Sequence, residues 1–283
     1  MTATTGTPRA RALAAALRTA REATKISVRA VAKTLDISHS VVSYWETGKR
    51  VPSSEDTASF LTAIGVTGEQ RERILEIARR AGEEDWLTAG IPGVSQQLAG
   101  VMECERTATA ITEWSPLIVP GMLQTSDYAR AIIGAGDMPG GQVEAKVALR
   151  MSRRDVLTRR EPSDLVALIS EAALHQIVGD HSVMADQLRH LAKTSETPTV
   201  TLQVLPDQPD WHPGLMGPFL LYEFADSPAI VHLEHHRSGV FLYGADDVDA
   251  YKTAAETIRR AAMSPARTAE LIAEVADKME TTQ

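Results

Sequence analysis

The side chains with the clearest chemical potential lie in one short polar run near the N-terminus. They are the hydroxyls and the imidazole of Ser38, His39, Ser40, Ser43 and Tyr44. The spacing of the last four puts them on one face of a helix, opposite an apolar face that contains Val41, Val42 and Trp45. This polar face carries hydrogen-bond donors and acceptors but no ion pairs, and its side chains let another surface approach closely. The chemistry that it favours is hydrogen bonding to a polar partner.

Two short helical patterns joined by a tight turn position this face. The first pattern covers residues 27–35, and residues 36–37 interrupt it. Its apolar stripe consists of Val28, Val31, Ala32 and Leu35. Ser38 then stands where a helix N-cap would accept an unpaired backbone N–H. The arrangement predicts a helix-turn-helix whose second helix enters the major groove of DNA. The alternative is a helical hairpin of an all-α domain that never contacts DNA.

Charge is distributed unevenly along the chain. Residues 1–52 contain nine Lys and Arg residues against three acidic ones, a net charge of +6. Because the formal net charge of the whole chain is −8, the remaining residues carry −14. Lys49 and Arg50 follow Gly48, which is placed to end the second helix. A basic segment on an acidic chain is the footprint expected for phosphate contacts.

This segment resembles the Cro/CI-like (XRE) DNA-binding domain over its full length, including the ending W-E-T-G-K-R. The resemblance implies that His39, Ser40 and Tyr44 reach base edges. Residues that it places nearer to phosphates are Arg29, Ser38, Ser43, Lys49 and Arg50. For Tyr44, packing with the hydroxyl at a phosphate is an equal alternative to base contact.

The same resemblance implies a structural ion pair and shows two departures from the family pattern. Arg21 and Glu46 match a pair that often ties the first helix to the recognition helix. Val28 replaces a frequent Gln that contacts phosphate, so that contact is missing here. Asp36 replaces a frequent Gly in the turn, and Asp tolerates the left-handed backbone conformation better than most residues.

The length of 283 residues and the hydrophobic content of 43% predict about two domains with real cores. Residues 8–80 are expected to form an all-α five-helix domain, residues 81–98 a linker, and residues 99–283 an α+β domain. The α+β domain should begin with a helix over residues 99–113 and contain a mostly antiparallel sheet of four or five strands. The strands are expected at residues 165–169, 199–205, 219–224, 230–233 and 240–243.

The second domain carries motifs of its own. W-S-P-L-I-V-P-G-M-L-Q-T-S-D-Y-A-R, I-S-E-A-A-L-H, V-T-L-Q-V-L-P and G-P-F-L-L-Y-E-F occur in this order. Together they resemble the C-terminal domain of actinobacterial XRE-type regulators, which are described as antitoxin-like and often paired with a small neighbour-encoded protein. The resemblance implies transcriptional regulation and no established enzymatic step.

Other chemistry receives weaker support. The weak candidates for metal ligands are His232, Glu234, His235 and His236, and a polar strand end is the favoured interpretation. The arginine-rich residues 141–160 suggest either a second nucleic-acid contact or, preferably, a face that is solvated or paired with acids. A nucleophile elbow, a Walker A loop, a dinucleotide fingerprint and H-E-x-x-H are all absent, so we expect no enzyme and no cofactor. Cys104 is the single cysteine, and we expect it to be inert.

These observations predict a sequence-specific DNA-binding transcriptional regulator that acts as a homodimer on an inverted repeat of double-stranded DNA. We expect a cytoplasmic protein without a membrane span, since no apolar run is long enough. The second domain should dimerise and sense a small protein partner or a ligand. The alternatives are an antitoxin-like module that acts mainly by binding a small neighbour-encoded protein, and an enzyme whose metal the histidine group would hold.

Overall fold

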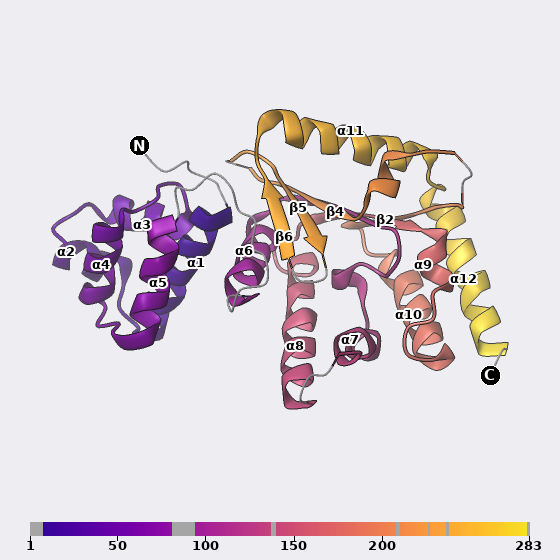
Figure 1. The fold of residues 1–283 in the computed structure, drawn as a ribbon, viewed down its shortest axis with the longest axis horizontal. Helices are drawn as coiled ribbons and strands as arrows, with labels where there is room; N and C mark the ends of the chain where they lie inside the picture. The colour runs from indigo at the N-terminus through magenta and orange to yellow at the C-terminus, as the bar shows by residue number, and fades with distance from the viewer. Residues whose placement is uncertain are drawn as a thin grey trace. The chain divides into compact units, whose positions relative to one another are not determined.

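The computed structural model describes residues 8–80, 94–136, 140–207, 210–225, 227–235 and 238–281 (Figure 1). The chain divides into two compact units. The helical unit comprises the described residues up to Thr107 together with His235–Phe241, and the sheet unit comprises Ala108–Glu234 and the described residues from Leu242 onward. Within the described residues, no helix has the length and apolar character needed to cross a membrane.

Six helices build the helical unit. They are α1 (Pro8–Ala23), α2 (Val28–Thr34), α3 (His39–Thr47), α4 (Ser54–Ala63), α5 (Gly68–Arg80) and α6 (Val94–Thr107). The first five share an apolar core, in which Trp45 of α3 meets Phe60 of α4 edge to face with ring centroids 6.5 Å apart. The first five helices confirm the predicted all-α, five-helix character of the N-terminal region.

The turn between α2 and α3 depends on two local features. Asp36 adopts the left-handed conformation with φ +53°, as the turn requires. The N–H of Ile37 then donates to the carbonyl of Ala32 at 3.0 Å, which closes the end of α2. Val28, which replaces the frequent family Gln, is partly buried and packs against the core of the unit. The local signals therefore suffice to make the turn without a glycine.

The helix predicted over residues 99–113 is wrong beyond Thr107. The structure has β1 (Ala110–Ser115) there, paired with a strand on each side. Only its first four positions alternate between partly exposed and buried, and Trp114 and Ser115 are both buried. Pairing on both edges therefore outweighs the helical spacing of the apolar residues before it. Of the linker predicted at residues 81–98, residues 81–93 lie outside the described part of the chain, and residues 94–98 begin α6.

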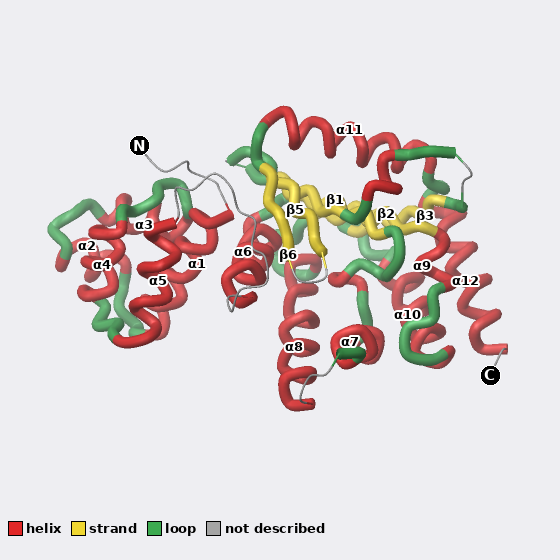
Figure 2. Tube along the Cα trace, viewed as in Figure 1, coloured by secondary structure: helices red, strands yellow, loops and turns green. Residues whose placement is uncertain are grey.

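In the described part of the chain, six strands form one mixed sheet in the order β3-β2-β1-β4-β5-β6 (Figure 2). The other strands are β2 (Asp164–Ser170), β3 (Val200–Leu205), β4 (Phe219–Glu223), β5 (Ile230–His235) and β6 (Ser238–Leu242). β1 pairs with β2 and β2 with β3 in parallel, whereas β1 with β4 and β4 with β5 are antiparallel. The α+β class is confirmed, and the parallel half is a feature that the sequence pattern did not predict.

Helices cover both faces of this sheet. On one face α11 (Ala245–Ala261) packs Val248, Ala255 and Ile258 against Trp114, Leu168 and Leu221 of the strands. The other face is covered by α7 (Ser126–Gly134), α8 (Gly140–Ser152) and α10 (His181–Thr194), as Figures 1 and 2 show. The remaining helices are α9 (Glu171–His175) and α12 (Pro265–Thr281), with the short 3-10 helices η1 (Gly121–Leu123), η2 (Arg153–Leu157) and η3 (Pro213–Met216).

The outer edge of β3 is not left open. The N–H of Val204 donates to the hydroxyl of Thr268 in α12 at 3.0 Å, and the carbonyl of Val204 accepts the N–H of Met263 at 2.8 Å. Because exposed strand edges invite pairing with other chains, this cover closes one edge of the sheet.

Candidate nucleic-acid interface

The polar face of α3 lies on the surface of the helical unit. His39 and Tyr44 are exposed, the latter to 47% of its surface, and Ser40 and Ser43 are partly exposed. The opposite face carries Val42 and Trp45, which are buried in the core. The helix therefore presents hydrogen-bonding groups outward on a short, rigid support.

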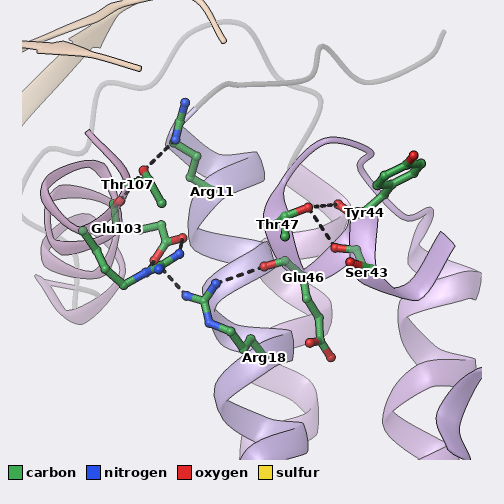
Figure 3. Close-up of polar contacts among 9 residues, drawn as sticks. Arg11, Arg18, Ser43, Tyr44, Glu46, Thr47, Glu103 and Thr107 are labelled. Carbon is green, nitrogen blue, oxygen red and sulfur yellow. Dashed lines mark hydrogen bonds and ion pairs between the residues drawn. The ribbon is translucent and has the colours of Figure 1, made fainter. Parts of the chain in front are cut away.

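Side-chain hydroxyls close both ends of α3. The Ser38 hydroxyl accepts the N–H of Ser40 at 3.3 Å at the start of the helix. At its end the Thr47 hydroxyl lies 2.8 Å from the carbonyl oxygen of Ser43 and 3.4 Å from that of Tyr44 (Figure 3). Because helix ends leave backbone groups unpaired, these bonds let a nine-residue helix hold its shape at the surface.

Exposed cations flank the polar face. Gly48 leaves the helix in the left-handed conformation with φ +73°, a geometry that glycine adopts without strain. The chain then turns back, and the N–H of Arg50 donates to the carbonyl of Tyr44 at 3.2 Å. Lys49 and Arg50 are exposed directly after the helix, and Arg29 is exposed in α2. Groups able to contact phosphates thus stand beside groups able to contact bases.

A buried ion pair joins α1 to α3. Arg21 donates from Nε to Oε1 of Glu46 at 2.7 Å and from Nη2 to Oε2 at 2.9 Å. Its Nη1 also donates to the carbonyl of Ile26 at 3.1 Å. The hydrogen bond with Glu46 raises the pKa of Arg21 above its usual value. A two-point contact between planar groups fixes an orientation as well as a distance.

A second arginine of α1 also reaches α3. Arg18 Nη1 donates to the backbone carbonyl of Glu46 at 3.1 Å (Figure 3). Arg18 was not among the residues singled out from the sequence. The signal that could have identified it is its position three residues before Arg21, which places both arginines on the same side of α1.

The arginine-rich stretch after α7 is engaged within the sheet unit. Arg150 Nη1 donates to the amide oxygen of Gln124 at 2.9 Å, and Arg159 Nη2 donates to the hydroxyl of Ser163 at 2.9 Å. A third arginine, Arg154, lies 2.8 Å from a ring nitrogen of His190. In these contacts the three arginines bind an amide, a hydroxyl and an imidazole of their own unit, and not the acids that the sequence pattern predicts.

The candidate metal ligands do not converge among the described residues, where no group of three His, Cys, Asp or Glu side chains is placed to hold an ion. His232 is buried on β5, whereas Glu234 and His235 are exposed at the end of the strand. Burial lowers the pKa of His232 to about 4. His236 lies outside the described part of the chain.

Two family comparisons match the chain. Residues 98–274 match the family described as a domain of unknown function (DUF5753), and residues 12–74 match the family described as a helix-turn-helix domain. No curated protein and no solved structure matches. The second match contains the whole of α2 and α3, and therefore the exposed polar face.

Proposed function

Because the chain belongs to the family of the domain of unknown function DUF5753 and has a helix-turn-helix domain ahead of it, we propose that it is a sequence-specific DNA-binding transcriptional regulator of the XRE type. The observation that carries the proposal is the exposed polar face of α3, flanked by exposed cations and fixed from behind by Arg21. Catalysis is not part of the proposal.

The proposed roles follow from position and side-chain chemistry. His39, Ser40 and Tyr44 contact base edges, because they project from the first two turns of the helix that enters the groove. The proposed phosphate contacts are Arg29, Ser38, Ser43, Lys49 and Arg50. Phosphate contacts of this kind fix register and affinity, whereas base contacts select the sequence.

We infer that two copies bind one inverted repeat of double-stranded DNA. A single α3 of nine residues covers only a few base pairs, and a symmetric pair of such helices doubles the sequence that is read. The sheet unit is the proposed site of dimerisation. A protein acting on chromosomal DNA in this way would work in the cytoplasm.

The sheet unit is also proposed to respond to a small neighbour-encoded protein or a ligand. Large apolar side chains are exposed on it at Leu117, Trp211, Leu215 and Met216, which supports a protein partner. The alternative is an antitoxin-like module that acts mainly by binding that small protein. Adding the small protein to the operator complex separates the two: a regulator changes its DNA affinity, and a module of the alternative type does not.

Selection from a random duplex library tests the proposed DNA binding directly. We expect the full chain to enrich a sequence of two inverted half-sites, with centres about 10 base pairs or a multiple of this apart. Sedimentation of the complex should show two chains on each duplex. Recovery of unselected sequences after repeated rounds would contradict sequence-specific binding.

A further inference from the structure

We propose that α6 positions the recognition helix α3, and that Glu103 does this by holding Arg18 against the backbone of Glu46. The proposal rests on α3 being the DNA-reading helix and adds a control point to it. α6 lies beyond the residues that match the helix-turn-helix family, at the start of the part that matches DUF5753.

One guanidinium connects the two helices. Arg18 Nη2 donates to Oε2 of Glu103 at 2.9 Å, and Nη1 of the same group donates to the carbonyl of Glu46 at 3.1 Å (Figure 3). Because the guanidinium is planar, a carboxylate that fixes one nitrogen also fixes the direction of the other. Glu103 is 5% exposed, so water competes little for this contact.

The carbonyl that Arg18 binds belongs to the last turn of α3. Carbonyls in a last turn have no partner within their own helix. Arg21 binds the side chain of Glu46 and Arg18 binds its backbone carbonyl, so two residues of α1 contact the same residue of α3. Loss of the Arg18 contact would remove the polar support of the Glu46 backbone, while Arg21 still binds the Glu46 side chain and Val42 and Trp45 still anchor α3 in the core. Lys49 lies three residues further along the chain.

Further polar contacts keep Glu103 and α6 in place. Arg106 donates from Nε and Nη2 to the two Glu103 oxygens at 2.8 and 2.7 Å, and this contact raises the pKa of Arg106. One turn further on, the Thr107 hydroxyl donates to the Glu103 carbonyl at 2.7 Å and accepts from Arg11 Nη1 at 2.8 Å. Arg11 and Arg18 of α1 thus both bind α6 (Figure 3).

The position of α6 in the chain turns this contact into a regulatory element. Only Ala108 and Thr109 separate α6 from β1, which pairs on both sides within the sheet. A displacement of β1 would therefore be transmitted through only two residues to Thr107, which contacts Arg11. Release of α6 would remove Glu103 from Arg18 and loosen the support of α3.

Binding of the full chain to DNA tests the proposal. The variants are Glu103→Gln, Arg18→Lys and, as a control, Glu69→Gln, which removes the same charge from an exposed ion pair with Arg73. We expect Glu103→Gln to lower affinity for the selected operator about three- to tenfold relative to the control, with equal affinity of both for a random duplex. Arg18→Lys should have a similar effect, because an ammonium lacks the planar fork, and Glu103→Gln should add little in that background.

A merely structural role predicts a different result. General destabilisation would lower binding to operator and random duplex alike, and the two substitutions would then add. Equal operator-to-random ratios for Glu103→Gln and Glu69→Gln would overturn the proposal.

Hydrogen exchange without DNA separates this proposal from the proposed function. In Glu103→Gln and Arg18→Lys we expect amides of the last turn of α3 to exchange several-fold faster, with α4 unchanged. Unchanged exchange in α3 overturns the role of α6 whether or not an operator exists. Faster exchange in a protein that selects no DNA sequence would support the role of α6 in positioning α3. It would contradict only the proposed function as a transcriptional regulator.

Discussion

Arg21 and Glu46 face each other in parallel, with Nε 2.7 Å from Oε1 and Nη2 2.9 Å from Oε2. The side chain of Arg21 is 13% exposed and that of Glu46 is 6% exposed. Because each group is planar and bound at two points, the pair restricts rotation of α3 against α1 as well as its distance. The direction in which the polar face points is therefore a property of the interface between the two helices.

Removal of one partner of this pair should strongly destabilise the helical unit. Arg21→Ala would leave the Glu46 carboxylate buried without its main partner, at a cost of about 3–5 kcal/mol in the free energy of unfolding. Urea denaturation followed by circular dichroism measures the loss. Arg73→Ala breaks an exposed pair with Glu69 and should cost less than ~1 kcal/mol. If both variants lose the same free energy of unfolding, burial of the Arg21–Glu46 pair contributes no additional stability.

The helix-turn-helix was readable from the sequence because its signals are local. Ser38 caps α3 as a serine before a helical pattern should, and Gly48 ends the helix in the conformation that favours glycine. Asp36 makes the turn through its own tolerance of positive φ. Each of these features depends on a few neighbouring residues, so a linear pattern contains them.

The parts that were missed depend on contacts distant in sequence. The sequence pattern predicts a helix that runs into β1, because the strand conformation of β1 depends on pairing with β2 and β4. The partners of Ala110 in these strands, Asp164 and Glu223, are 54 and 113 residues away. The contact between Arg18 and Glu103 joins residues 85 apart. Neither strand pairing nor an ion pair between residues so far apart produces a hydrophobic periodicity or a capping residue that could be recognised in the sequence.

Lys49→Ala should weaken binding to all DNA sequences alike. If the ammonium contacts a phosphate, its loss removes one displaced counterion, and the slope of log affinity against log salt should flatten by about one unit. Fluorescence anisotropy of the operator and a random duplex at several salt concentrations measures both effects. Lys25→Ala removes the same charge from the turn after α1 and serves as the control for net charge. A change in base preference with an unchanged slope would refute the phosphate role.

His39→Ala should instead change which base is preferred at one position of each half-site. Loss of a base contact reduces discrimination by about 1–3 kcal/mol at that position and leaves the salt slope nearly unchanged. Selection from a random library with the variant shows the altered position directly, and Ser40→Ala should affect a neighbouring one. If His39→Ala and Lys49→Ala both lower affinity uniformly, the assignment of the reading face to these residues is wrong.

The buried imidazole of His232 should make the sheet unit less stable in mild acid. Burial is the main reason why its pKa falls from an ordinary 6.5 to about 4; Glu234 opposes this shift and the nearby Arg153 contributes to it. Between pH 6.5 and pH 4 the imidazole is protonated in the unfolded chain but neutral in the folded chain. Protonation therefore favours unfolding, and the stability that is fully present above pH 6.5 is lost as the pH falls toward 4. The loss is roughly 3 kcal/mol over that window.

Urea denaturation at pH 7 and pH 5, followed by tryptophan fluorescence, to which the buried Trp114 contributes, measures this dependence. His232→Leu removes the group that must be protonated, so the variant should lose less stability than the wild type between the two pH values. His175→Leu changes a histidine that is 49% exposed in the same unit and should keep the wild-type dependence. An equal loss in His232→Leu and the wild type would assign the acid sensitivity to groups that both proteins share, such as the carboxylates and His190, whose pKa burial also lowers.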